Sequence, residues 1–396
     1  MKEQTILIDQ WPGQERKKSF GVSRRTFLKL ASSAGILLGL PGINWSEGRA
    51  LLAATGNDER FVREARYWEK KAHKQVHCQL CPRGCVVDDH ERGYCGVREN
   101  RGGTYYTLVY SRAATYHIDP IEKKPLFHFL PGSMAFSIAT AGCNLNCKFC
   151  QNWQISQVTP EQVDSYYLPP QKLATLAREY KTKSIAYTYN EPTIFYEYMY
   201  DTAVAAQEQS VKSVVITAAY IEHDPIAELC QVVDAIKVDL KAFSEKYYKD
   251  IVHGELKPVL QALETIRKQD TWLEIVYLVV PTLNDSEAEI KKLSRWIKRY
   301  LGPDVPIHFT RFFPQYLLKN LPPTPVATLD RCKAIADAEG LHYVYVGNVP
   351  GHPAENTYCP HCGKPLVERI GFTIKSMHIT NGKCPYCGTK IPGIWK

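Results

Sequence analysis

The chain has 396 residues, a formal net charge of +8, 44% hydrophobic residues and 23% charged residues. Its length predicts two or three structural units with a sizeable core, and its composition excludes a mostly disordered chain, a collagen-like chain and a polytopic membrane protein. Residues 1–50 carry a net charge of +4, with eight Lys/Arg and four Asp/Glu, so only +4 is spread over the remainder. Because that remainder has no long basic run, we expect no nucleic-acid partner.

Residues 1–55 have the features of an export leader. The pair Arg24 and Arg25 precedes an apolar stretch from Leu30 to about Leu40. That stretch is too short to span a hydrocarbon core of ~30 Å. A paired arginine before a short apolar run is typical of a twin-arginine signal, and the alternative is a basic amphipathic helix that happens to contain the pair.

Residues 56–130 are predicted to form a helix followed by a four-cysteine segment. The helix is expected over 58–75, with its apolar side chains on one side. The segment has the spacing C-x2-C-x3-C-x9-C, and its cysteines are Cys78, Cys81, Cys85 and Cys95. Four thiolates within 18 residues can enclose one metal centre. An auxiliary [4Fe–4S] cluster that relays electrons and a structural zinc ion are both open alternatives.

Residues 131–352 alternate short β-branched runs with longer helical stretches. Strands are expected at 134–140, 184–189, 213–217, 234–240, 272–280, 305–313 and 342–346. Helices are expected near 170–181, 194–209, 225–232, 256–269, 285–300 and 328–339. This alternation predicts parallel βαβ units, arranged as a partial barrel or as a doubly wound sheet. The absence of G-x-G-x-x-G and Walker A sequences disfavours a dinucleotide or nucleotide-phosphate site.

A group of three cysteines follows the first of these strands. Cys143, Cys147 and Cys150 have the spacing C-x3-C-x2-C. Three thiolates on one loop can hold three irons of a [4Fe–4S] cluster, which leaves the fourth iron open for chemistry. A Cys3His zinc site would need a histidine, and none lies in this loop. The loop is expected at the carboxyl mouth of the barrel, where such folds place their chemistry.

This loop, with Phe149 before the last cysteine, resembles the signature of the radical S-adenosylmethionine (SAM) superfamily. The chain is most similar to the branch of pyruvate formate-lyase activating enzymes and, within it, to the radical SAM member of the AmmeMemoRadiSam system. The stretches that carry this resemblance are 78–100, 119–129 (DPIEKKPLFHF), 143–153, 188–193 (TYNEPT), 238–243 (VDLKAF) and 345–348 (YVGN). Together the resemblance covers roughly 77–394.

The resemblance implies a partial (β/α)6 TIM-type barrel and an enzyme that cleaves SAM reductively at the cluster. The product would be a 5′-deoxyadenosyl radical, which takes a hydrogen atom from a substrate. A glycyl hydrogen of a protein is one implied target. The implied partners are a reductant such as flavodoxin or ferredoxin and Memo-like and Ammecr-like proteins.

Several residues at strand ends are candidates for binding SAM. The resemblance implies that Glu191 binds the SAM ammonium, and the alternative is an acid favoured at a helix N-terminus. Thr217 is a second candidate, although Ala218 and Ala219 stand where relatives carry a glycine. The loss of that glycine puts a positive-φ backbone contact in doubt.

Three further candidates lie on later strands. Asp239 ends the fourth strand, where relatives place an Asp near SAM or a cation; the alternative is an ion pair with Lys241. His308 is expected to face the same mouth, either as a SAM contact or as a structural histidine. Gly347 and Asn348 follow the last strand and would let the backbone approach adenine.

Residues 353–396 are expected to form a separate module. Two CPxCG motifs supply four cysteines, which are Cys359, Cys362, Cys384 and Cys387. This pattern is typical of a zinc-ribbon or rubredoxin-like site, which predicts zinc, with a single iron as the alternative. The remaining two of the 13 cysteines, Cys230 and Cys332, are expected to be small buried residues.

A non-catalytic, exported iron–sulfur protein for electron transfer is the alternative function. Several metal centres and an export leader would suit such a protein. The leader indicates export to the periplasm or attachment to a membrane, whereas SAM and its reductant indicate the cytoplasm.

Overall fold

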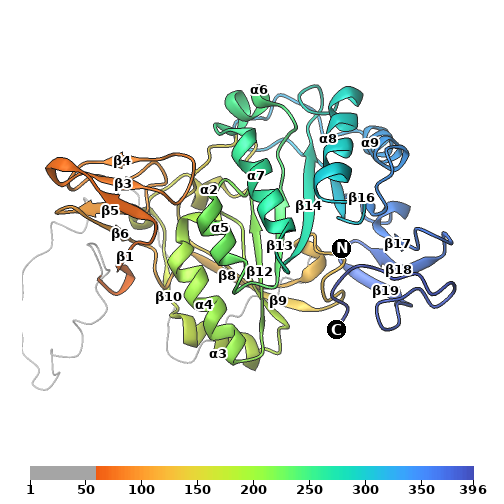
Figure 1. Ribbon diagram of the computed structural model, residues 1–396, viewed down its shortest axis with the longest axis horizontal. Helices are drawn as coiled ribbons and strands as arrows, with labels where there is room; N and C mark the ends of the chain where they lie inside the picture. The colour runs from red at the N-terminus through yellow and green to blue at the C-terminus, as the bar shows by residue number, and fades with distance from the viewer. Residues whose placement is uncertain (1–58) are drawn as a thin grey trace, which may run out of the picture. The chain divides into compact units, whose positions relative to one another are not determined.

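A computed structural model describes residues 59–396, which we call the described unit (Figure 1). The leader predicted for 1–55 lies outside the described residues. Within 59–396, no helix has both the length and the apolar character that are needed to span a membrane.

An eight-stranded sheet forms the centre of this unit. Its order is β16-β15-β14-β13-β12-β11-β9-β8, and all strands from β9 to β16 run parallel while β8 pairs antiparallel with β9. The strands are β8 (Thr115–Pro120), β9 (Met134–Ala139), β11 (Ser184–Tyr187), β12 (Lys212–Thr217), β13 (Ala235–Asp239), β14 (Trp272–Val279), β15 (Ile307–Arg311) and β16 (Val344–Gly347). The spatial order follows the chain without reversal, which excludes a doubly wound sheet. The sheet is therefore a partial barrel with one parallel strand more than six.

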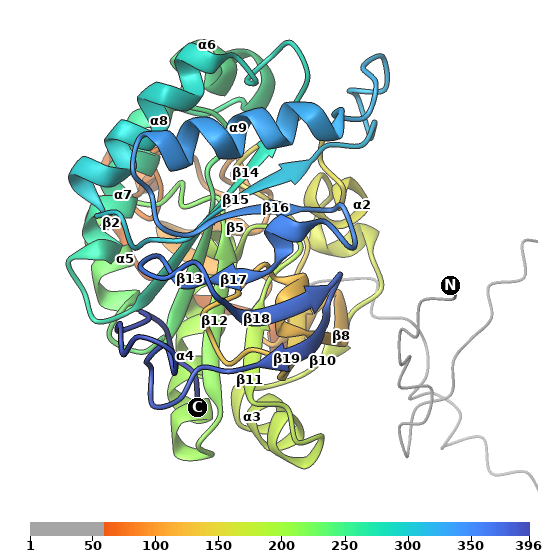
Figure 2. The same ribbon diagram turned by 90° about the vertical axis from the view of Figure 1, so that its right-hand side faces the viewer.

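Helices connect the parallel strands and cover the outside of the sheet (Figure 2). They are α3 (Pro170–Glu179), α4 (Tyr196–Glu208), α5 (His223–Leu229), α7 (Leu256–Arg267), α8 (Glu287–Tyr300) and α9 (Val326–Ala338). The seven predicted strands and six predicted helices of this region are thus confirmed. The start of α8 shows why a helix begins there. The Ser286 side chain accepts a hydrogen bond from the Glu289 N–H, and Ile290 and Leu293 of the apolar face are buried.

The helix predicted over 58–75 is wrong. This segment forms a 3-10 turn (Glu59–Phe61) and two short strands, β1 (Arg63–Glu64) and β2 (Trp68–Lys70). Strand β2 pairs with β3 (Val76–Cys78), which pairs with β4 (Val86–Val87), and β1 pairs with β6 (Thr104–Thr107), which pairs with β5 (Arg98–Arg101). Strand pairing therefore overrides a charged, helix-favouring sequence.

The segment 121–130 fills part of the barrel interior. Ile121, Leu126 and Phe129 of this segment pack against small residues of the strands, among them Ala135, Ala186, Val214 and Ala235. The end of the chain adds to this plug, because the Ile394 N–H donates to the His128 carbonyl at 2.7 Å and the Ile394 carbonyl accepts from the Leu130 N–H at 2.6 Å. The segment 121–130 follows directly on β8 and reaches β16, where the Phe127 ring lies 4.9 Å from that of Tyr345.

The buried carboxylate of Glu274 on β14 fixes this plug. Its oxygens accept hydrogen bonds from the backbone N–H groups of Phe127 (3.0 Å) and His128 (2.8 Å) and from the Trp272 indole (3.0 Å). One oxygen also lies 2.8 Å from His308 Nε2. Glu274 is 0% exposed, so each of these donors would lose a partner that water cannot replace.

The C-terminal module lies at the end of the unit opposite the four-cysteine segment (Figure 1). Its strands are β17 (Thr357–Tyr358), β18 (Pro365–Ile370) and β19 (Thr373–Met377). Buried Arg369 donates to the Phe127 carbonyl at 2.9 Å, and His128 Nδ1 lies 2.7 Å from the Pro392 carbonyl oxygen. The module is thus part of the core of the described unit.

We predict that Glu274→Ala lowers the free energy of unfolding by about 3–5 kcal/mol, because it strands four buried donors at once. Urea unfolding followed by circular dichroism measures this loss. The matched control is Glu208→Ala on the exposed surface of α4, which should stay within about 0.5 kcal/mol of the parent. A loss for Glu274→Ala no larger than that of the control would contradict the plug's dependence on this carboxylate.

Candidate active site

The three-cysteine loop follows the carboxyl end of β9 and is held from two sides. Its Gly142 N–H donates to the Ile155 carbonyl at 2.8 Å, in the short helix α2 (Trp153–Ser156). The N–H groups of Asn146 and Lys148 donate to carbonyls of the π-helical turn Tyr248–Val252, at 3.2 and 2.9 Å. The thiols of Cys143, Cys147 and Cys150 are half-buried. The loop is thus positioned by backbone contacts before any ligand binds.

Gly142 also places the loop against the four-cysteine segment. Its φ of +91° lies in the left-handed region, and a Cβ there would come within 2.6 Å of the Cys95 carbonyl oxygen and of Val97. The Gly142 carbonyl accepts from the Asn190 side chain at 3.0 Å. Only glycine fits this position, where two cysteine groups far apart in sequence pack together.

Glu191 lies beside the loop and is already hydrogen-bonded by the protein. One carboxylate oxygen accepts from the Thr193 N–H (3.1 Å), the Thr193 hydroxyl (2.8 Å) and the Thr217 hydroxyl. The other accepts from the Ala218 N–H at 2.8 Å. The predicted alternative, an acid at a helix N-terminus, is therefore present, since Glu191 caps the turn Pro192–Phe195. Burial and then the Glu191 charge raise the pKa of the Cys143 thiol.

The structure brings Glu191 and Thr217 together. The positive φ that the missing glycine put in doubt is present in the loop after β12. Ala219 has a φ of +54°, and its N–H donates to the Thr217 hydroxyl at 2.8 Å. An L-residue in this conformation costs about 1–2 kcal/mol. The loop after β12 thus keeps the left-handed turn with alanine.

Asp239 forms two ion pairs at the end of β13. Its carboxylate contacts Lys237 and lies 3.4 Å from the Lys241 Nζ. The ion-pair alternative is therefore present, with Lys237 as a partner that the sequence did not indicate. Burial alone would raise the pKa of the Asp239 carboxyl, but the two lysines outweigh burial and hold that pKa below its ordinary value.

A second buried ion pair, between Asp119 and Lys124, was missed from the sequence. Lys124 Nζ lies 2.5 Å from Asp119, which also accepts from the Ser137 hydroxyl at 2.8 Å and from the Tyr189 hydroxyl. Burial lowers the pKa of Lys124 to about 8, although Asp119 opposes this shift. Burial would raise the pKa of Asp119, but Lys124 and the two hydroxyls lower it overall. The polar Ser137 within the apolar strand β9 is the one sequence signal that could have indicated this pair.

His308 and Asn348, on and after the last two strands, bond to protein groups. His308 is 1% exposed and lies in the Glu274 network, with its ring 4.7 Å from that of Phe127 and 4.9 Å from that of Tyr345. His308 therefore has the structural role that was the alternative prediction. A contact between His308 and SAM stays a prediction. The Asn348 side chain is exposed after β16 and donates to the Arg311 carbonyl at 3.1 Å.

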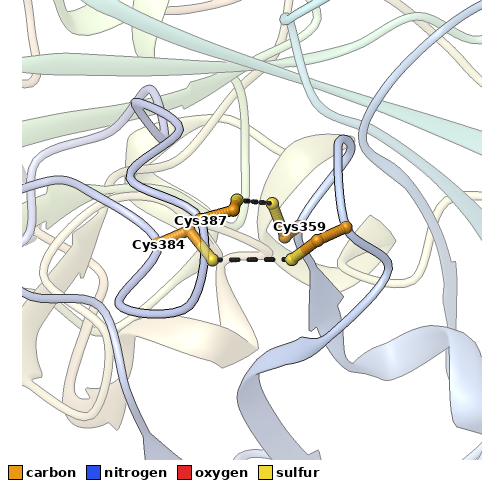
Figure 3. A group of neighbouring side chains, drawn as sticks. Cys359, Cys384 and Cys387 are labelled. Atoms are coloured by element: carbon orange, nitrogen blue, oxygen red, sulfur yellow. Dashed lines mark hydrogen bonds between the residues drawn. The ribbon is translucent and has the colours of Figure 1, made fainter.

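The C-terminal cysteines converge on one point (Figure 3). The four Sγ atoms of Cys359, Cys362, Cys384 and Cys387 all lie within 4.8 Å of one another. Cys359 and Cys387 are separated by 3.6 Å, and Cys362 and Cys384 by 3.7 Å. Four sulfurs at this spacing can bind a single metal ion. The lone cysteines Cys230 and Cys332 are buried, as predicted.

Comparisons with known proteins found relatives in sequence and in structure. The sequence profile of the radical SAM superfamily matches residues 137–293. The uncharacterized protein MJ0808 of Methanocaldococcus jannaschii is 42% identical over 332 residues, which are 83% of this chain and 99% of that protein. The pyruvate formate-lyase-activating enzyme of Clostridium pasteurianum is 24% identical over 166 residues, which are 40% of this chain and 66% of that enzyme.

Among solved structures, a radical SAM methyltransferase from Sphaerobacter thermophilus matches with a TM-score of 0.44 and 18% identity. The match covers 55% of this chain and 67% of that one.

We predict that Asp119→Asn destabilises the protein by about 3 kcal/mol at pH 7, because it leaves Lys124 buried without its partner. The Asp119 pKa is lower in the folded state, so its stabilising effect is present above about pH 4 and is lost as the pH falls through the unfolded and then the folded value. The difference between parent and variant should therefore shrink in urea unfolding below about pH 4. Asp270→Asn, at an exposed position, is the control. A difference that is independent of pH would contradict the ion pair.

Proposed function

Since this chain belongs to the radical SAM superfamily, we propose that it cleaves SAM reductively at a [4Fe–4S] cluster and uses the resulting radical to remove a hydrogen atom from a substrate. One observation carries the proposal: Cys143, Cys147 and Cys150 lie on one preorganised loop at the carboxyl end of a parallel barrel strand. The likeness to an activating enzyme supports the same reaction class.

The residues present fit the group that the family implies. Three half-buried thiols on one loop match a cluster with three protein ligands and one open iron. When bound, the cluster and SAM supply one-electron cleavage of the sulfonium–C5′ bond and a 5′-deoxyadenosyl radical. Lys241 lies near this loop and would offset part of the negative charge of the thiolates, since its charge acts on Cys147.

We propose Glu191 as the acceptor for the SAM ammonium. The oxygen that accepts from the Ala218 N–H has a second lone-pair site, because a carboxylate oxygen can accept about two hydrogen bonds. Thr193 and Thr217 hold the opposite oxygen and so fix the orientation of the carboxylate. Asp239 and Lys241 are the partly exposed charges on the neighbouring strand, with 27% and 17% of their side chains exposed, and they are available to the SAM carboxylate or the substrate.

A protein is the proposed source of the abstracted hydrogen, and the likeness to an activating enzyme supports this. The proposed electron donor is a flavodoxin or ferredoxin. Memo-like and Ammecr-like proteins are the proposed partners, and co-purification with the tagged chain tests them.

We predict that Cys147→Ser abolishes formation of 5′-deoxyadenosine from SAM. The assay uses the anaerobically reconstituted protein with SAM and dithionite, and the product is quantified by liquid chromatography. Cys332→Ala is the matched control, because Cys332 is a buried cysteine of α9 away from the loop. Equal 5′-deoxyadenosine formation by Cys147→Ser and the parent would overturn the site. No cleavage by the parent would remove the enzymatic function and favour an electron-transfer protein.

The C-terminal cysteines are proposed to bind one structural zinc ion. Tetrahedral zinc with bonds of 2.3 Å places its sulfurs about 3.8 Å apart, close to the 3.6 and 3.7 Å observed.

We predict that Cys362→Ser loses about one zinc per chain without loss of iron. Its unfolding temperature should fall, because Cys359 and Cys384 pack with Phe127 and Tyr345 in one core cluster. Mass spectrometry of the metals measures the first effect, and unchanged zinc would contradict the assignment.

A further inference from the structure

Four cysteines distant from the active-site loop in sequence form a second site. We call Cys78, Cys81, Cys85 and Cys95 the N-terminal cage. The Cys78 N–H donates to the Cys85 carbonyl at 2.9 Å, and the Tyr94 N–H donates to Cys85 Sγ at 3.5 Å. These contacts turn the hairpin β3–β4 and the following loop toward each other. All four cage residues line one cavity.

The spacing of the sulfurs separates the cage from the zinc site. In the described part of the chain, the C-terminal cysteines are the one set of three or more ligating side chains whose atoms lie within 4.8 Å of one another. No three of the cage sulfurs meet this criterion, and the four cysteines line one cavity. A single zinc ion draws its sulfurs to about 3.8 Å, whereas cysteine sulfurs on a [4Fe–4S] cluster lie about 6 Å apart. The wider spacing of the cage sulfurs therefore favours a cluster over a single zinc ion.

A buried cation with a free donor faces the same cavity. Arg98 is 1% exposed and lines the cavity, and among residues 59–396 its Nε has no hydrogen-bond partner. The other end of the guanidinium is fixed, because one nitrogen donates to the Arg66 carbonyl at 3.0 Å and the other pairs with Glu197. A free N–H on a cation that lines the cavity can donate to a cluster sulfur, and hydrogen bonds of this kind tune cluster potentials.

The cage shares a wall with the active-site loop. Asn144, the residue after Cys143, lines the cavity, and its carbonyl accepts from Arg83 Nε at 2.9 Å. The other side of the cage faces solvent. Cys85 and Cys95 are half-buried, and Tyr94 is 48% exposed beneath the Arg83 guanidinium. The cage thus lies between the surface and the proposed SAM site.

We propose that the N-terminal cage holds a [4Fe–4S] cluster through which electrons reach the SAM cluster. This electron route rests on the function proposed above. A low-potential donor protein is oxidised by one electron, and the cage cluster is reduced from the 2+ to the 1+ state. The cage cluster then returns to 2+ as the SAM cluster is reduced from 2+ to 1+. No proton is transferred and no bond changes in this step. With four protein ligands, the cage cluster has no open iron for substrate.

Metal analysis tests the cluster without any assay of activity. The anaerobically reconstituted full chain should contain about eight irons and eight sulfides, and the double variant Cys81→Ser/Cys95→Ser about four of each. Zinc should be the same in both proteins. Cys230→Ala, at a lone buried cysteine, should match the parent. About two zinc ions and four irons in the parent, with one zinc lost in the double variant, would overturn the cluster assignment in favour of structural zinc.

Rapid-freeze paramagnetic resonance of the parent protein tests the electron route. After mixing with a reduced flavodoxin or ferredoxin, the reduced cage cluster should appear before the reduced SAM cluster, which addition of SAM identifies by a spectral change. Reduction of the SAM cluster first would overturn the route.

In the double variant, the ratio of the cleavage rate with the donor protein to that with dithionite should fall at least tenfold. An unchanged ratio would refute the relay, because the cage cluster would then have only a structural role. Absence of SAM cleavage by the parent would defeat the proposed function, while the iron count would still decide the cluster.

Discussion

The two edges of the central sheet do not pair with each other in the described unit, and the rest of the structure depends on how this gap is filled. A parallel sheet left open would expose its interior strands and their polar side chains to water. The segment 121–130 closes the gap because the Glu274 carboxylate binds two of its backbone N–H groups. The C-terminal module then covers that segment through Arg369 and Ile394. Distant parts of the chain therefore stabilise one interior.

Closure of the barrel decides the chemistry available inside it. Asp119, Lys124, Lys237 and Glu274 are almost fully buried and carry charge in a region of low dielectric constant. Such groups are tolerated only in pairs, and pairs of this kind hold their partners in fixed positions. The barrel therefore holds fixed, paired charges beside its apolar core.

The sequence predicted the barrel well and the peripheral segments poorly, for physical reasons. Strands such as Trp272–Val279 are mostly apolar runs between amphipathic helices, with Glu274 as the one charged residue, and this pattern depends on local burial alone. The cysteine loop was identified because its ligands are close in sequence. By contrast, Trp68–Lys70 is a strand only because Val76–Cys78 pairs with it. The ion pair of Asp119 with Lys124 and the pairing of His308 with Glu274 depend on the strand register, which periodicity does not determine.

The structure separates the two four-cysteine groups by the distances between their sulfurs, which the sequence spacing does not give. Both could be assigned to zinc or iron from their spacing alone. In the C-terminal group, two tight turns bring the sulfurs to within bonding distance of one ion. In the N-terminal cage, no three sulfurs lie that close together, and Arg98 and Asn144 line the cavity with the four cysteines. The buried Arg98–Glu197 pair fixes this cation at the cavity wall, because removing either charge would leave the other unpaired in the core.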